Sequence, residues 1–537
     1  MAQLHFLKNY VILPSMKQPK SIELSAEEIE GLKQRLMDNS LSLADKELLK
    51  GILDFSCWLQ QVLSEAKITI KKLQSLVFGA KTEKKTATEK SKTPRENTSK
   101  LAKKGHGRYK ANCYTGATIE SVPSGFKKGD LCPQQCGGKL YLISPGIVIR
   151  IRGGQMASAI RYELEKLRCA LCGFIVTAAL PKEASVEKYD ISLRTQLCIF
   201  KYYLGMPFYR IQMAQSMVGI PLPDATQWDL IRKVIKIMAP IYNTLQLLAA
   251  QGKTIWADDT IMRVLSLLKE NTIDLKRKGI YTTGISVQFE ERFIHLFMTG
   301  RNNAGENAGQ LLNQRLNSET VFYMSDASSA SQPEGVLPDI LIKLIICSCL
   351  VHGRRKFYEL LTIFPEVCQS VIDKLAIIYE NDAYCKQHRL TMEERLAYHQ
   401  KESTPLMLAL HQWLHKQKEL IEPNSALGKA IQYMLNHWEK MTRFLTIAGA
   451  PLDNNIVERT LKIAIRNRKN AYFYKTEKGA EAGDILMSII HTCVANEINP
   501  VDYLTECQKH PEEVANHPDL WLPWNYKKFE IPLANTA

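Results

Sequence analysis

The feature that most constrains the fold is a pair of apolar, strand-like segments that each lead into an acidic residue. Residues 254–257 run into Asp258 and Asp259, and residues 320–325 run into Asp326. An aspartate in such a position is, by itself, more often a turn residue or a helix cap than a metal ligand. Carboxylates at neighbouring strand ends repel one another unless divalent cations neutralise them. The pair therefore predicts a metal site if a third acid joins it.

The segments between the two acids complete a mixed sheet. Residues 279–288 and 293–299 alternate as the two strands of a hairpin, and residues 305–316 have the spacing of a helix. The order strand, hairpin, helix, strand predicts an α/β core of the ribonuclease-H type, whose first part we assign to 251–335. In that fold a later helix brings a third carboxylate to the two strand ends.

That helix is predicted within residues 450–470, where Asp453 and the two asparagines after it offer capping side chains. Its buried face consists of the apolar residues that recur at helical spacing, which are Val457, Leu461, Ala464 and Ile465. Glu458 lies off that face, as a lone acid among basic residues. The basic residues expected to contact DNA phosphates are Arg459, Lys462, Arg466, Arg468 and Lys469. Taken alone, the pattern also fits a solvated helix with an internal ion pair between Glu458 and Lys462.

Three motifs carry a resemblance to a known family: WADDT around Asp258, CLVHGRRKFYEL over 349–360, and APLDNNIVERTLKIAIRNRKNAYF from residue 450, followed by INPVDYL over 498–504. On these motifs the chain resembles, over nearly its whole length, the DDE transposases of the insertion-sequence-66 family. It departs from the family at Asp259, where Glu is usual, and at 326–328, where an Asp-Gly-Tyr run is usual.

The resemblance implies a transposase of a bacterial insertion sequence, with Asp258, Asp326 and Glu458 as the catalytic triad. We expect these acids to hold two Mg2+ or Mn2+ ions, about 3.5 to 4 Å apart, for DNA cleavage and strand transfer. The expected partners are the ends of the element, the target DNA, further copies of the chain and small accessory transposition proteins. Two alternatives stay open: an inactive DNA-binding protein derived from a transposase, and a structure-selective nuclease of the same fold that cuts without joining.

The charge of the chain agrees with a nucleic-acid partner. Its 537 residues carry 70 Lys and Arg against 55 Asp and Glu, a formal net charge of +15. Such a charge favours polyanions over small substrates, although ribosome-associated and membrane-surface proteins share it. The N-terminus lacks the pattern of a signal peptide, and the longest apolar stretch, 340–351, is interrupted by Lys343 and too short to span a bilayer. We therefore expect a cytoplasmic protein.

Four of the thirteen cysteines form two knuckles. Cys132 and Cys136 are spaced C-x3-C, Cys169 and Cys172 are spaced C-x2-C, and a glycine follows each pair. This pattern predicts a structural Zn2+ with four thiolate ligands and no open position for catalysis. Ordinary free thiols in two turns are the alternative. We assign a small zinc-binding and DNA-binding domain to 106–181.

The N-terminal region predicts helices. Ser25 and Glu28 form a capping box, and apolar residues from Ile52 to Leu76 keep near-heptad spacing. The spacing fits an oligomerising coiled coil within 1–80 and equally a helical hairpin. Residues 81–105 contain few apolar side chains and are rich in Lys, Ser and Thr, which is typical of a flexible basic linker.

Residues 182–250 also have helical composition. A Gly-Ile-Pro turn at 219–221 separates two apolar runs, which predicts a helix-turn-helix with 223–234 as the reading helix. Many helical subdomains share this pattern.

More than a hundred residues separate Asp326 from Glu458, far more than an ordinary connection. We assign 336–450 to a helical insertion, 451–483 to the helix that returns Glu458 to the core, and 484–537 to a C-terminal region specific to the family.

A compact basic cluster lies near the start of this insertion. It consists of His352, Arg354, Arg355 and Lys356, which we expect to contact DNA phosphates. The plain alternative is a solvated helix start. A zinc site that uses His352 with Cys347 and Cys349 is a further alternative, disfavoured because the flanking apolar run reads as buried.

Overall fold

The structure is a computed structural model that describes residues 26–38, 40–53, 187–270 and 278–526, with short stretches at 55, 129, 139, 156–159, 166–168, 175–177 and 179. The four knuckle cysteines, the linker 81–105 and most of the heptad stretch lie outside the described residues, so the zinc and coiled-coil predictions stay predictions. By its internal contacts the chain divides into two compact units, 1–80 with 159–537 and 81–158.

Short elements precede the main fold. Helix α1 spans Ala26–Met37, and a further helical stretch covers 43–53. Strands β1 (Lys166–Arg168) and β2 (Ile175–Thr177) pair antiparallel, with Arg168 opposite Ile175. The second cysteine knuckle falls in the sequence between these two strands.

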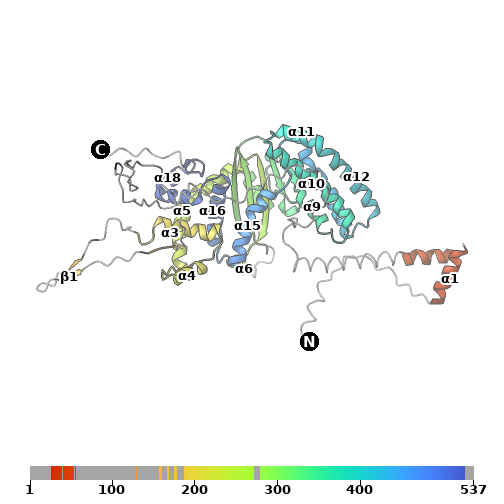
Figure 1. The fold of residues 1–537 in the computed structure, drawn as a ribbon, viewed down its shortest axis with the longest axis horizontal. Helices are drawn as coiled ribbons and strands as arrows, with labels where there is room; N and C mark the ends of the chain where they lie inside the picture. The colour runs from red at the N-terminus through yellow and green to blue at the C-terminus, as the bar shows by residue number, and fades with distance from the viewer. Residues whose placement is uncertain are drawn as a thin grey trace, which may run out of the picture. The chain divides into compact units, whose positions relative to one another are not determined.

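A mixed sheet of five strands forms the centre of the fold, in the order β5-β4-β3-β6-β7. Its members are β3 (Thr254–Ile261), β4 (Tyr281–Phe289), β5 (Arg292–Gly300), β6 (Val321–Ser325) and β7 (Leu344–Ser348). Strands β3, β4 and β5 are antiparallel neighbours, whereas β6 pairs parallel with both β3 and β7. This topology is consistent with the predicted ribonuclease-H-like core (Figure 1).

The sequence interpretation was wrong in two places within the sheet. Strand β3 does not end before Asp258 but continues through both aspartates to Ile261. The apolar run 340–351 is buried only in part, because Leu341 and Ile342 are exposed whereas residues 347–350 are buried. It contains the end of α8 (Pro338–Leu341), the whole of β7 and the first residues of α9 (Leu350–Tyr358). The predicted strands of the hairpin and the strand before Asp326 are confirmed to within two residues.

Two helices cover opposite faces of the sheet. Helix α7 (Ala304–Leu312), shorter than predicted, starts in a capping box of Asn303 and Glu306 and meets β4 where Asn307 donates to Thr283 Oγ1. Helix α15 (Asn455–Ala471) contacts β3 and β4 on the side of Gly284. Because successive residues of a strand point to opposite faces, α7 and α15 sandwich the sheet.

Helix α16 (Glu477–Ala495) closes the β5 edge of the sheet. An unpaired strand edge presents N–H groups that need acceptors, and here four side chains at four-residue spacing supply them. The pairs are Thr299 N to Asp484 Oδ2 (2.7 Å), Phe297 N to Ser488 Oγ (2.8 Å), His295 N to Thr492 Oγ1 (3.0 Å) and Phe293 N to Asn496 Oδ1 (3.2 Å).

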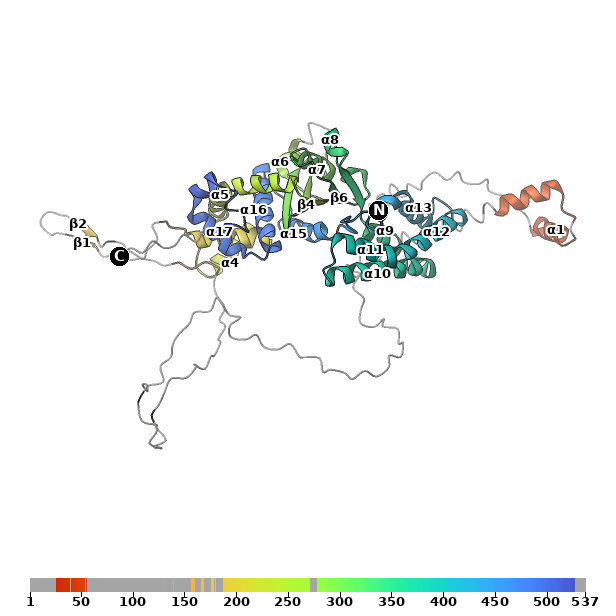
Figure 2. The ribbon, with the colours of Figure 1, turned by 90° about the horizontal axis from the view of Figure 1, so that it is seen from above.

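The helices between β7 and α15 share one core with the sheet. They are α9, α10 (Pro365–Gln387), α11 (Met392–Glu402), α12 (Thr404–Leu420), α13 (Ala426–Asn436) and α14 (Trp438–Thr442). Buried residues of the insertion such as Leu375 and Met434 belong to the same cluster as Trp256, Phe322 and Met324 of the sheet. The insertion gathers beyond the β6–β7 end, opposite α5 and α16 (Figure 2).

A second group of helices surrounds the β5 end. It comprises α3 (Ile191–Cys198), the π-helical turn η2 (Ile199–Tyr203), α4 (Phe208–Met217), α5 (Asp224–Ala250), α17 (Pro500–Lys509) and α18 (Pro511–Asn516). The expected reading helix is the first half of α5, which runs on to Ala250 and buries Ile231, Val234 and Met238. The remaining short elements are α6 (Leu265–Glu270) and the 3-10 turns Ser329–Ser331 and Arg443–Leu445. In the described part of the chain no helix combines the length and apolar character needed to cross a bilayer.

Candidate active site

Two of the predicted acids lie at matching levels of adjacent parallel strands. Trp256 of β3 pairs with Met324 of β6. Asp258 lies two residues beyond Trp256, and Asp326 lies two residues beyond Met324. The neighbouring Asp259 has a different environment, because its Oδ2 accepts the first N–H of α7, from Ala304, at 3.2 Å.

The third acid, Glu458, comes from the first turn of α15. Burial raises the pKa of Asp258 to about 7, and the negative charges of Asp326, Glu458 and Asp259 contribute to that rise. The three predicted acids therefore lie in one electrostatic environment, drawn from segments 68 and 132 residues apart in sequence. A largely buried carboxyl group with two further carboxylates beside it is the kind of oxygen donor set that hard divalent cations prefer.

Gly284 allows α15 to approach this site. It is the register partner of Asp258 on β4. A Cβ atom at position 284 would lie 2.8 Å from Leu461 Cγ and 3.3 Å from Val457 Cγ2, so only a glycine leaves room for the helix. Val457 flanks Glu458 in sequence, which ties the position of the acid to this contact.

The loop before α15 is clamped to β3. Trp256 Nε1 donates to Asp453 O (3.1 Å), and the buried Asn454 donates through Nδ2 to Ala257 O (3.1 Å). Of the expected caps, Asp453 accepts the Asn455 N–H at 3.0 Å, but Asn454 does not cap the helix with its side chain. Its amide instead joins α15 to the residue before Asp258.

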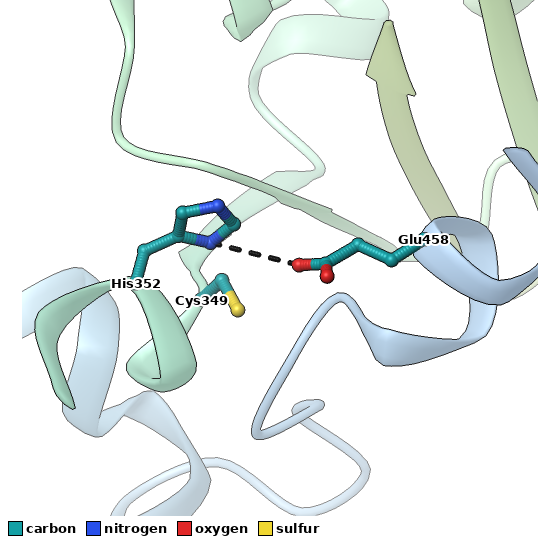
Figure 3. A group of neighbouring side chains, drawn as sticks. All are labelled: Cys349, His352 and Glu458. Atoms are coloured by element: carbon teal, nitrogen blue, oxygen red, sulfur yellow. Dashed lines mark ion pairs between the residues drawn. The ribbon is translucent and has the colours of Figure 1, made fainter. Parts of the chain in front are cut away.

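Glu458 also faces the insertion. Its Oε1 lies 3.9 Å from His352 Nδ1 (Figure 3). Its Oε2 lies 3.8 Å from Arg355 Nη2. Cys349 completes a group in which the potential ligand atoms of Cys349, His352 and Glu458 all lie within 4.8 Å of one another. Within the described residues no other set of three such side chains meets that distance, so Asp258 and Asp326 are not part of so tight a group. Among the described residues, the alternative set of His352 with Cys347 and Cys349 does not meet that distance.

The basic side chains of α9 lie beside different neighbours. Arg354 lies over the ring of Tyr358, with 5.7 Å from Cζ to the ring centroid, and Lys356 lies over Tyr433 at 5.2 Å. Arg355 is the member of the cluster that lies beside Glu458.

The basic residues of α15 fall into two classes. Arg459, Lys462, Arg466 and Lys469 are exposed and recur at intervals of three and four, so they form one stripe along the helix. We call these four residues the α15 stripe. Arg466 also donates to Tyr203 O, so it offers phosphate only the rest of its guanidinium. Arg468 is only partly exposed, and its guanidinium donates to Thr260 Oγ1 at 3.1 Å and to Ile261 O. Beyond the stripe, Tyr472 and Phe473 are 64% and 45% exposed, and Tyr472 has a φ of 65°.

Gly284 was not singled out from the sequence. Asn454 was expected only as a helix cap, and Cys349 only as a partner of Cys347 and His352, so their contacts with β3 and Glu458 were not predicted. A glycine inside a strand pattern is a usable signal for close backbone approach. The contact from Asn454 to β3 spans 197 residues and leaves no local pattern.

Comparison with known proteins finds a family model and several relatives that this chain matches. The model described as "Transposase IS66 family" matches residues 188–482, more than half of the chain. Two uncharacterized proteins of Sinorhizobium fredii are similar to it: y4hP is 24% identical over 391 residues (68% of this chain and 67% of that protein), and y4jD is 25% identical over 355 residues (63% and 66%). A third, y4qI, is 27% identical over 187 residues, about a third of each chain.

Proposed function

The chain belongs to the IS66 family of transposases, and from this premise we propose that it cuts and joins DNA with Asp258, Asp326 and Glu458 as the ligands of two divalent cations. The observation that carries the proposal is that Asp258 and Asp326 follow paired residues of adjacent parallel strands, with Glu458 close enough to help raise the pKa of Asp258. The donor set fits the group, since three carboxylates suit Mg2+ or Mn2+ and Glu458 Oε1 is buried without a hydrogen-bond partner.

When bound, two such ions activate a water or a DNA 3'-hydroxyl and stabilise the leaving oxygen of the phosphodiester. Asp258 offers a carboxylate from β3, and Asp326 offers one from the residue that follows β6. Glu458 closes the set from α15, held in place by the Gly284 contact and the Asn454 clamp. Arg355 lies 3.8 Å from Glu458 Oε2, so it offers a positive charge to a phosphate at the same place.

The α15 stripe supports a path for DNA away from these acids. From Arg459 to Lys469 the helix rises ten times, or about 15 Å at about 1.5 Å per residue. Along the axis of duplex DNA, one strand carries a phosphate about every 3.4 Å, so the stripe matches the axial length of roughly four of them. The exposed rings of Tyr472 and Phe473 at its far end offer faces on which bases can stack.

The remaining parts of the proposal rest on the sequence and the family. A structural Zn2+ held by Cys132, Cys136, Cys169 and Cys172 would shape a DNA-binding module, and pairing of two element ends calls for at least two copies of the chain. Small accessory proteins and a cytoplasmic, nucleoid-associated location belong to the same proposal.

A strand-transfer assay tests this function. Labelled element ends with free 3'-hydroxyls are incubated with target DNA, Mg2+ and either the wild-type chain or Glu458→Gln. We expect joined product with the wild type alone and similar binding of the ends by both proteins. Cleavage without joining would favour a nuclease of this fold, and binding without either reaction would favour an inactive DNA-binding protein.

A further inference from the structure

Cys349, His352 and Glu458 bring three different donor atoms to one place: a thiol sulfur, an imidazole nitrogen and a carboxylate oxygen. All three lie within 4.8 Å of one another (Figure 3). Around a tetrahedral Zn2+ the ligand bonds are about 2.0 to 2.3 Å long, which places neighbouring ligand atoms roughly 3.3 to 3.8 Å apart. The group is therefore within a small side-chain adjustment of a metal-binding geometry.

Two atoms of this group have no hydrogen-bond partner. His352 Nδ1 and Glu458 Oε1 are both buried and both lack a hydrogen bond, and the 3.9 Å between them is too long for one. Leaving a buried polar atom unpaired is costly, so each such atom calls for an explanation. A cation between them would satisfy both at once.

The backbone holds Cys349 and His352 in advance of any ligand. Cys349 N donates to Ser325 O at 2.9 Å, which ties the start of α9 to the end of β6. Cys349 Sγ accepts the Asn454 N–H at 3.3 Å. His352 follows three residues later, within the first turn of α9, so its ring and the sulfur lie on the same side of the helix.

The chemical type of the three ligand atoms determines which cation the site prefers. Mg2+ and Mn2+ prefer oxygen ligands, whereas thiolate and imidazole favour Zn2+ and similar borderline cations. We propose that Cys349, His352 and Glu458 form a second metal site, for Zn2+ or Co2+, which withdraws Glu458 from Asp258 and Asp326. Binding would replace the thiol proton, so that one S–metal bond forms while one proton passes to solvent.

The second part of this inference, inhibition, rests on the proposed function, because it assumes that Glu458 serves the Mg2+ reaction. A borderline cation at the second site would then compete with Mg2+ through their shared ligand. Zinc would act as an inhibitor, and removing the sulfur would relieve the inhibition.

Binding is measured first, with the full-length chain and Co2+ as the probe. Thiolate-to-cobalt absorption is titrated for the wild type, Cys349→Ser and Cys347→Ser. Cys347 is the matched control, a buried cysteine two residues away that is not part of the group. Any Co2+ held by the knuckle cysteines contributes equally to all three proteins.

We expect Cys349→Ser to lose one equivalent of thiolate-bound Co2+, or to bind it at least about tenfold more weakly, while Cys347→Ser matches the wild type. His352→Gln should weaken the same equivalent, which separates lost ligation from a local folding defect at position 349. Equal titrations of the wild type and Cys349→Ser would overturn the site.

Inhibition is measured second. For each protein, the rate of DNA cleavage with Mg2+ plus Zn2+ is divided by the rate of the same protein with Mg2+ alone. The ratio should be low for the wild type and near one for Cys349→Ser. Co2+ binding at Cys349 with no Mg2+-dependent cleavage by any variant would contradict the proposed function and leave the site standing. Normal cleavage with equal zinc inhibition of both proteins would overturn the inhibitory role.

Discussion

Gly284 of β4 and Leu461 of α15 approach so closely that a Cβ atom at position 284 would lie 2.8 Å from Leu461 Cγ. The same glycine pairs with Asp258 across the β3–β4 ladder. The contact between the sheet and α15 thus lies beside one candidate metal ligand, Asp258. It lies one helical turn from another candidate ligand, Glu458. The packing at Gly284 therefore helps to set the relative positions of these two candidate ligands.

Gly284→Val should therefore displace α15 and with it Glu458. Overpacking of this kind costs about 1 to 3 kcal/mol of unfolding free energy, and we expect strand transfer to fall by more than the loss of folded protein explains. Denaturant unfolding and the strand-transfer assay measure the two effects. Gly300→Val is the matched control on β5, where an added Cβ meets nothing within 4 Å. Equal activity of both variants would contradict the role of Gly284.

Ser488→Ala should destabilise the β5 edge. Ser488 Oγ accepts the Phe297 N–H and is fully buried, so its removal leaves that N–H without a partner. The expected loss is about 1 to 3 kcal/mol of unfolding free energy. Ser216→Ala, at an exposed position of α4, should change it by less than about 0.5 kcal/mol. Indistinguishable denaturation midpoints for the two variants would show that α16 does not protect the edge in this way.

The core could be predicted from the sequence to a useful extent, because β3, the hairpin and β6 each carry a local apolar pattern bounded by polar residues. Strand β7 was missed because its apolar residues continue into α8 and α9 without a glycine or proline to mark the boundaries. Asp258 and Glu458 were chosen as candidates from motifs, and Asp326 was chosen as the acid that follows a strand-like segment. The link from Cys349 and His352 to Glu458 did not, because it depends on how a long insertion folds back between them.

Neutralising the α15 stripe should weaken DNA binding without changing its sequence preference. Lys462→Gln removes one exposed positive charge, and we expect the slope of log affinity against log salt concentration to fall in magnitude by roughly one. Fluorescence anisotropy across a salt series measures it on specific and random duplexes. Lys418→Gln, an exposed lysine at the end of α12, serves as the control and should leave the slope unchanged. A change confined to one DNA sequence would point to base recognition instead.

The stability of the metal-free protein should depend on the protonation of Asp258. Its folded-state pKa of about 7 lies above the ordinary value of 3.8, so its contribution to stability is complete below about pH 4 and is lost as the pH rises through 7. Asp258→Asn should flatten this decline. Because Mg2+ binds the ionised carboxylate, it should raise the melting temperature of the wild type more at about pH 8 than at about pH 5.

Asp484 provides the control for this pH effect. Burial raises its pKa to about 7 as well, but it accepts hydrogen bonds from Thr299 on the edge of the sheet. Asp484→Asn should also flatten the metal-free decline while leaving the pH-dependent gain from Mg2+ in place. Loss of the Mg2+ gain in Asp484→Asn, with its retention in Asp258→Asn, would contradict the assignment of Asp258 as a ligand.

The central claim is that Asp258, Asp326 and Glu458 share bound cations. Anomalous diffraction from crystals of the full-length chain grown with Mn2+ and an element-end duplex tests it most directly. We expect manganese peaks within ligand distance of all three carboxylates, with at least one peak bonded to Asp258 and a second acid. Manganese absent from these residues, in crystals where the duplex end occupies the site, would contradict it.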